Sequence, residues 1–225
     1  MHSHYTRLLA WEAFRELVQN WRDAIIDSYD LEERKFRGLV KRQDNSQHRL
    51  IDVIYRVLDP DSQANGREEW LGYIRFQGTR GMGEVEIVNR RATLQPWHLK
   101  LGGTSKRHSK DQAGSHGEGF KLAILVMMPG LNHSVVCHSG GFKWKFDFNN
   151  NGDFCTRLIR MTPKMIDQVR EDSKKSLRMG LIPFVASPQE DVKFIIGRAG
   201  PGNDSSGNKT SRGKVSLDQG GLVFR

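Results

Sequence analysis

The stretch GGTSKRHSKDQAGSHGEGFKLA, residues 102–123, decides how the rest of the chain is interpreted. It opens on two glycines and a Thr-Ser-Lys-Arg run, and it closes on three more glycines directly before an apolar run. These three are Gly114, Gly117 and Gly119. Glycines just before a helix start let backbone N–H groups converge on an anion, and the helix dipole adds partial positive charge there. Because Lys106 and Lys121 add full charges, the stretch predicts a loop that binds the phosphates of a nucleotide.

Taken alone, this glycine pattern is a weak signal. It has neither the dinucleotide-binding spacing nor the P-loop spacing, and glycines often mark turns only. Phosphate binding by this loop is therefore supported only if other segments of the chain carry residues of a nucleotide site.

A second polar pattern lies on the first predicted helix, residues 8–29. One apolar face follows the helical spacing: Phe14, Leu17, Val18, Trp21 and Ile25. Glu16, Asn20 and Asp23 share a different face. They form either a solvated polar stripe or a site in which the amide oxygen binds Mg²⁺ and the carboxylate orients a water. Asparagine is a poor helix former, which favours the site.

The order of the remaining elements predicts an α+β domain. Strands are expected over 50–58, 70–76, 83–88, 134–138, 142–148, 154–161 and 192–196, and the first three fit a meander. Further helices are expected over 117–128 and from Pro163 to 179, the second capped by Thr162. Residues 32–47 continue the first helix or form a loop, and 198–214 form a mobile loop. The pattern predicts one antiparallel or mixed sheet with helices on one face.

Composition limits the classes of protein that the chain can belong to. Its 225 residues carry a net charge of +9, so nucleic acid, anionic lipid or polyphosphate could bind it, although a solvated basic surface explains the charge equally well. Cys137 and Cys155 form no disulfide framework or metal motif, and we expect buried reduced thiols in an intracellular protein. No run is apolar enough to span a membrane. The strand-like end at residues 221–225 suggests a piece excised from a longer protein.

Three motifs follow one another along the first 121 residues. They are E-x-x-x-N-x-x-D on the first helix, then L-x-L-G-G-T-S-K, then G-x-x-G-x-G-x-K. This order resembles the GHKL ATPase superfamily, which includes the MutL mismatch-repair proteins and type II topoisomerases, and it is most similar to the Microrchidia (MORC) branch. The resemblance covers residues 13–128. It implies a single Bergerat-type α/β sandwich over 1–225, a mixed, mostly antiparallel sheet with helices on one face, and an ATP lid over 102–116.

The resemblance also implies site residues. Glu16 would be the general base that activates the attacking water, Asn20 would ligate Mg²⁺, and Asp23 would shape the pocket wall. Asn89 would lie at the adenine end. The lid and second glycine box would supply the other contacts to ATP: Thr104, Ser105, Lys106, Gly114, His116, Gly117, Glu118, Gly119, Phe120 and Lys121.

The chain departs from the family at one motif. The family carries Asp-x-Gly-x-Gly after its third strand, and its Asp accepts a hydrogen bond from the adenine amino group. Here the sequence is Asn89-Arg90-Arg91-Ala92-Thr93. The amide oxygen of Asn89 can still accept, but both glycines are replaced.

Three functions follow as hypotheses. The first is Mg²⁺-dependent ATP binding and hydrolysis that drives lid closure or homodimerisation, in a nuclear or cytoplasmic protein associated with chromatin or DNA. The second, motivated by the replaced glycines, is a non-hydrolysing module for protein interaction or dimerisation. The third is a basic nucleic-acid-binding domain whose loops hold phosphodiesters.

Overall fold

The computed structural model describes residues 2–45, 50–64, 68–79, 82–95, 119–130, 134–149, 151, 153–197, 201–203 and 209–211. The predicted lid, 102–116, lies outside them. Two parts of the predicted loop over 198–214 form the short antiparallel strands β9 (Pro201–Asn203) and β10 (Lys209–Ser211).

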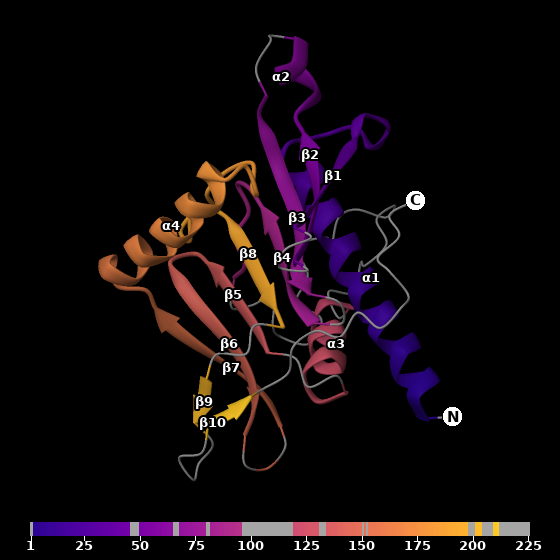
Figure 1. The fold of residues 1–225 in the computed structure, drawn as a ribbon, viewed down its shortest axis with the longest axis vertical. Helices are drawn as coiled ribbons and strands as arrows, with labels where there is room; N and C mark the ends of the chain where they lie inside the picture. Colours follow the sequence, from indigo (N-terminus) through magenta and orange to yellow (C-terminus); the bar gives the residue numbers. More distant parts are fainter. Residues whose placement is uncertain are drawn as a thin grey trace.

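One eight-stranded sheet organises the described chain (Figure 1). Its order is β1 (Gly38–Asn45), β2 (Leu50–Leu58), β3 (Trp70–Thr79), β4 (Met82–Asn89), β8 (Val192–Ile196), β5 (Val135–Ser139), β6 (Phe142–Phe148) and β7 (Phe154–Arg160). The seven predicted strands are confirmed, as is the α+β class. All pairs of neighbouring strands in this sheet are antiparallel, so the expectation of a mixed sheet is wrong.

Strand β1 was not predicted. It is an edge strand that pairs only with β2 among the described strands, and its Leu39 and Val40 side chains are exposed. Its sequence, GLVKRQDN, lacks the apolar alternation of a half-buried strand because it has almost nothing to bury.

Two helices cover one face of the sheet. Helix α1 (His2–Ser28) packs against β4 and against α3 (Gly119–Leu125), which continues as a π-helical turn over Val126–Gly130. The core on this face joins both helices to strands β2, β3, β4, β8, β5 and β6 through side chains that include Trp21, Ile25, Val57, Ile74, Ile87, Ile124, Cys137, Trp144 and Phe194. Burying large apolar side chains of this kind is the main stabilising contribution to the fold.

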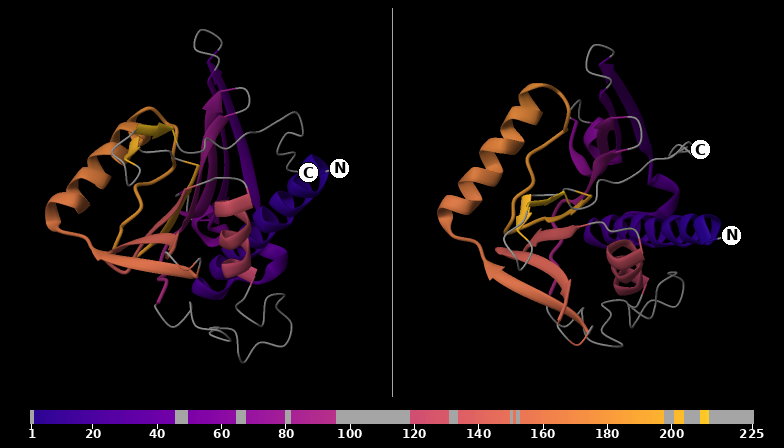
Figure 2. Two further views of the ribbon diagram at one scale, coloured as in Figure 1. Left: turned by 90° about the horizontal axis from the view of Figure 1, so that it is seen from below. Right: turned by 60° about the horizontal axis from the view of Figure 1, so that its bottom comes forward.

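The other face is covered differently. Helix α4 (Pro163–Arg178) lies on the side of the sheet away from α1 and α3 (Figure 2), so the prediction of helices on one face is wrong for α4. The chain that follows it packs Ile182 and Ala186 against Tyr73 and Val88. The predicted cap is confirmed, since the Thr162 hydroxyl accepts a hydrogen bond from the Met165 N–H at 3.3 Å. Two short helical turns, η1 (Glu33–Lys35) and α2 (Pro60–Ala64), lie in connections.

The two cysteines differ in their environments. Cys137 is buried, as predicted, and burial raises the pKa of its thiol well above the usual value. Cys155 is exposed, so the prediction of burial is wrong for it. It lies on the edge strand β7, on the face opposite to Phe154, whose ring stacks on Phe146 of the core. Within the described residues, no helix is both long and apolar enough to cross a membrane.

Candidate functional site

Helix α1 is locked to the end of β4 by two hydrogen bonds. The Trp21 indole N–H donates to the Val88 carbonyl at 2.8 Å, and the Asn89 side-chain amide donates to the Trp21 carbonyl at 2.7 Å. Both residues are buried. The reciprocal pair satisfies polar groups that would otherwise be costly to bury, and it holds Asn89 against the helix that carries Glu16, Asn20 and Asp23.

A glycine in β3 allows this close approach. A Cβ atom at Gly72 would lie 2.6 Å from the Val88 carbonyl oxygen and 2.8 Å from Cδ1 of Ile25. It would also lie 3.1 Å from Nε1 of Trp21, the donor of the first hydrogen bond. Any larger residue would therefore push α1 away from β4.

On α1, the predicted ligand side chain is already oriented. The Asn20 amide nitrogen donates to the Glu16 backbone carbonyl at 2.7 Å. Its Oδ1 atom is therefore the one that remains to serve as an oxygen ligand, the type that Mg²⁺ prefers. Within the described residues, no three His, Cys, Asp or Glu side chains form a cluster that could hold a metal ion.

The two α1 carboxylates that the sequence singled out, Glu16 and Asp23, differ in exposure. The Glu16 side chain is 31% exposed and lies 3.7 Å from the Arg15 guanidinium, so it is accessible to water. Asp23 is buried, and its Oδ1 lies 3.6 Å from Nη1 of Arg22. Their roles as general base and pocket wall stay predictions.

The end of the second glycine box lies next to α1. Gly119 and Phe120 form the first turn of α3, and Ala123 and Ile124 anchor that helix in the core where it packs on α1. Lys121 is partly exposed on the same helix. The remaining predicted contacts lie outside the described residues: Thr104, Ser105, Lys106, Gly114, His116, Gly117 and Glu118.

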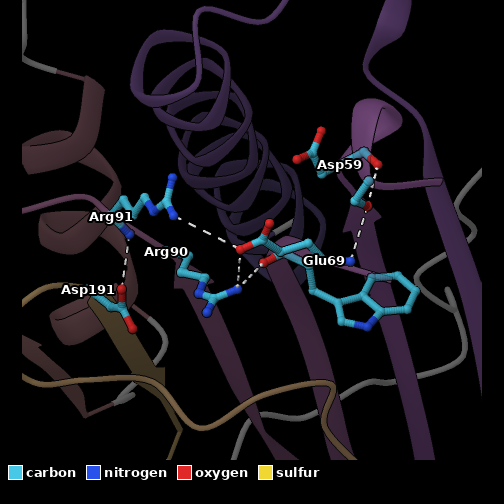
Figure 3. Close-up of polar contacts among 7 residues, drawn as sticks. Asp59, Glu69, Arg90, Arg91 and Asp191 are labelled. Atoms are coloured by element: carbon cyan, nitrogen blue, oxygen red, sulfur yellow. Dashed lines mark hydrogen bonds and ion pairs between the residues drawn. The ribbon is translucent and has the colours of Figure 1, made fainter. Parts of the chain in front are cut away.

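The backbone after Asn89 takes an unusual conformation. Arg91 has φ of +55°, in the left-handed region that favours glycine, and it occupies the place of the first glycine of the family motif. Its N–H donates to Oδ1 of Asp191 at 2.9 Å (Figure 3). The other carboxylate oxygen, Oδ2, accepts from the Ser187 N–H at 2.7 Å. Burial raises the pKa of Asp191, although both hydrogen bonds oppose the shift. The Asp191 carboxylate thus joins the loop after β4 to the chain just before β8 through these two hydrogen bonds.

The two arginine side chains contact protein groups (Figure 3). Arg90 Nη1 lies 3.5 Å from Oε1 of Glu69, and its guanidinium lies 5.3 Å from the centre of the Phe184 ring. The Arg91 guanidinium lies 5.5 Å from the centre of the Tyr29 ring and 4.0 Å from the same Glu69 oxygen. Cation–π contacts and shared ion pairs therefore hold both arginines on neighbouring elements.

No family model, curated protein or solved structure matches the chain.

Sequence reasoning missed the residues that support the site. Trp21 was assigned to the apolar face of α1, but its indole N–H and carbonyl also join that helix to β4. Asp191 gave no sequence signal because its partner, Arg91, lies 100 residues away. Gly72 could have been found, since an isolated glycine inside a strand often marks a close backbone approach.

Proposed function

We propose that the chain is a Mg²⁺-dependent domain that binds and hydrolyses ATP. One observation carries the proposal. Helix α1, with Glu16, Asn20 and Asp23, contacts both the end of β4 at Asn89 and the helix that follows the glycine box. Segments that are far apart in the sequence, and that belong to the resemblance, therefore meet around a single helix.

Each residue has a role that its environment permits. Glu16, accessible at the surface, would accept the proton of the attacking water. The Oδ1 atom of Asn20 would hold Mg²⁺, which neutralises charge on the phosphates when it is bound. Asn89 would offer its amide oxygen to the base, because its amide nitrogen already donates to Trp21. The lid and the glycine box would hold the phosphates through backbone N–H groups.

The use that we propose for this chemistry is a conformational switch. Closure of the lid over ATP would bring two copies of the chain together, inside the nucleus or the cytoplasm. Such a switch needs ATP to bind the closed state more tightly than the open state, because a ligand shifts an equilibrium only by its differential affinity.

The experiment combines thermal unfolding with ATP turnover. A ligand that binds only the folded state stabilises it by about RT ln(1 + [L]/Kd), so millimolar MgATP should raise Tm. Glu16→Gln should keep this rise and lose turnover, whereas Asn20→Ala should lose the part of the rise that depends on Mg²⁺. Glu12→Gln is the matched control, one turn earlier on α1, where Glu12 pairs with Arg15 on the exposed surface. No rise in Tm for the wild type would sink the proposal, and turnover that survives Glu16→Gln would sink the role of that residue.

A second candidate is a module that binds nucleotide without hydrolysing it. The observation that favours it is the loop after β4, where Arg90 and Arg91 replace a flexible glycine segment and bind Glu69. This candidate predicts a rise in Tm with MgATP but no turnover in the wild type. The same pair of measurements therefore separates the two functions.

A further inference from the structure

Basic side chains gather on the outer face of the β6–β7 edge of the sheet. In β6, Trp144 and Phe146 point into the core, so Lys143 and Lys145 point to the opposite face. In β7, Phe154 packs on the core side, so Arg157 points the same way as the two lysines. We call Lys143, Lys145 and Arg157 the basic strip.

Two members of the basic strip are paired against each other. Lys145 lies directly opposite Arg157 in the antiparallel register, and both side chains are exposed. Like charges in directly opposed positions destabilise a strand pair. No described residue forms an ion pair with either side chain.

The residues beside the strip include one imidazole and one carboxylate on the same face, His138 and Asp147. Lys143 pairs in register with His138 of β5. Burial, together with the positive charges of Lys193 and Lys143, lowers the pKa of His138 to about 4, so it is neutral at pH 7. Asp147 is the one carboxylate between Phe142 and Phe148, and its Oδ1 accepts a hydrogen bond from the Phe148 N–H. The strip keeps a net positive charge on a chain that is basic overall.

We infer that the basic strip binds the phosphate backbone of nucleic acid. Lys143 and Lys145 are two residues apart on one strand, which spaces them by about 6.8 Å. A duplex carries one phosphate charge per strand for about every 3.4 Å of its axis, so cations several ångströms apart can contact different phosphates of one backbone. Because Trp144 and Phe146 face the core under α1 and α3, the strip points to the other face of the sheet, the side on which α4 lies (Figure 2). It is therefore separate from the proposed nucleotide site.

A nucleic acid fits this surface better than a membrane does. Juxtamembrane basic clusters contain about four to eight Lys or Arg residues, and the strip has fewer. The exposed apolar side chains of these strands, Phe142 and Leu158, lie on the opposite face, so none could enter a bilayer beside the cations. Backbone phosphates need no apolar contact.

The test is the salt dependence of DNA binding in the full chain without nucleotide. Fluorescence anisotropy with a 20-base-pair duplex at several salt concentrations gives the slope of log K against log salt. Each lost phosphate contact should reduce that slope by about 1, so Lys145→Gln/Arg157→Gln should reduce it by about 2 and weaken binding at low salt at least tenfold. Arg34→Gln/Lys35→Gln removes the same charge from two exposed residues that share Glu32, and it should leave the slope near that of the wild type.

Three results would overturn the inference. The first is failure of the wild type to bind the duplex at 50 mM salt. The second is an equal change of slope in both double variants, which would mean that net charge and not the basic strip causes the binding. Alternatively, vesicles containing anionic phospholipid could compete with DNA and lose binding in the same variant, which would assign the strip to a membrane surface. Because ATP is absent from the assay, failure of the proposed ATPase function would leave the result unaffected.

Discussion

Replacing Asn89 by aspartate should destabilise the chain, even though aspartate is the residue that the GHKL motif carries there. The Asn89 amide nitrogen donates to the Trp21 carbonyl at 2.7 Å, and the residue is only 5% exposed. A carboxylate has no proton to donate, so two acceptors would face each other in a buried place. The contact that joins α1 to β4 would become repulsive.

The magnitude follows from the groups involved. Removing one partner of a buried hydrogen bond costs about 1–3 kcal/mol, and more when the group left unpaired is charged. We expect Asn89→Asp to lose about 3 kcal/mol of unfolding free energy at pH 7.5. Against a total of about 5–15 kcal/mol for a typical domain, this loss is readily measured.

The sign of the pH dependence provides a sharper test. Burial beside a carbonyl should raise the pKa of the introduced carboxyl above its value in the unfolded chain. A protonated carboxyl can donate to Trp21, so the stabilising form is present at low pH and is lost as pH rises through the raised pKa. The deficit of Asn89→Asp should therefore be small near pH 4.5 and full at pH 7.5. Asn89→Ala, which leaves the Trp21 carbonyl unpaired without adding a charge, should cost about 1–3 kcal/mol at both pH values.

Urea denaturation of the wild type and both variants at the two pH values measures these differences. Other titrating groups are common to all three proteins, so they cancel in the comparison. Wild-type stability of Asn89→Asp at pH 7.5 would refute the reasoning, as would a deficit that is independent of pH. Either result would mean that the Asn89 amide does not hold α1 against β4.

Three further predictions concern the support of the sheet. Asp52→Asn should cost about 3–5 kcal/mol in urea denaturation, because Arg75 binds both carboxylate oxygens at 3.0 and 2.6 Å in a buried pair, whereas Asp52→Leu/Arg75→Met should be close to neutral. The free energy of unfolding should fall as pH drops from about 6.5 to about 4, because the unfolded chain protonates His138 while burial keeps it neutral in the fold. His138→Gln should remove most of this pH dependence, and an unchanged curve would contradict the role given to His138. Thr162→Ala should lower stability by about 1 kcal/mol by removing the acceptor for the Met165 N–H, with Thr162→Ser retaining wild-type stability as the control.

The elements that the sequence predicted well are those with a buried apolar face. Helix α1 and strands β2, β3 and β4 show their period because each buries one side in the core. Strand β1 was missed because an edge strand with exposed Leu39 and Val40 has no such period. The side of the sheet that α4 covers was also missed, because periodicity gives the buried face of a helix but not the surface that buries it.

In the candidate site too, local sequence patterns could be predicted and long-range contacts could not. Glu16, Asn20 and Asp23 could be found because they are close in sequence and share a helix face. The contacts that place this helix, from Trp21 to Asn89 and Val88, join residues 67 and 68 positions apart. No local pattern encodes such pairs, so the sequence points to candidate side chains more readily than to the scaffold that positions them.

The loop after β4 keeps a backbone conformation that glycine favours, although it contains no glycine at Arg91. In sequence, the replacement of glycine by Arg91 suggests that the loop conformation is gone. In the structure, Arg91 still adopts the left-handed backbone, at a cost of about 1–2 kcal/mol for a residue with a side chain. The hydrogen bond from its N–H to Asp191 and its contacts with Tyr29 and Glu69 offset that cost. Tertiary contacts thus impose on Arg91 the conformation that glycine would adopt freely.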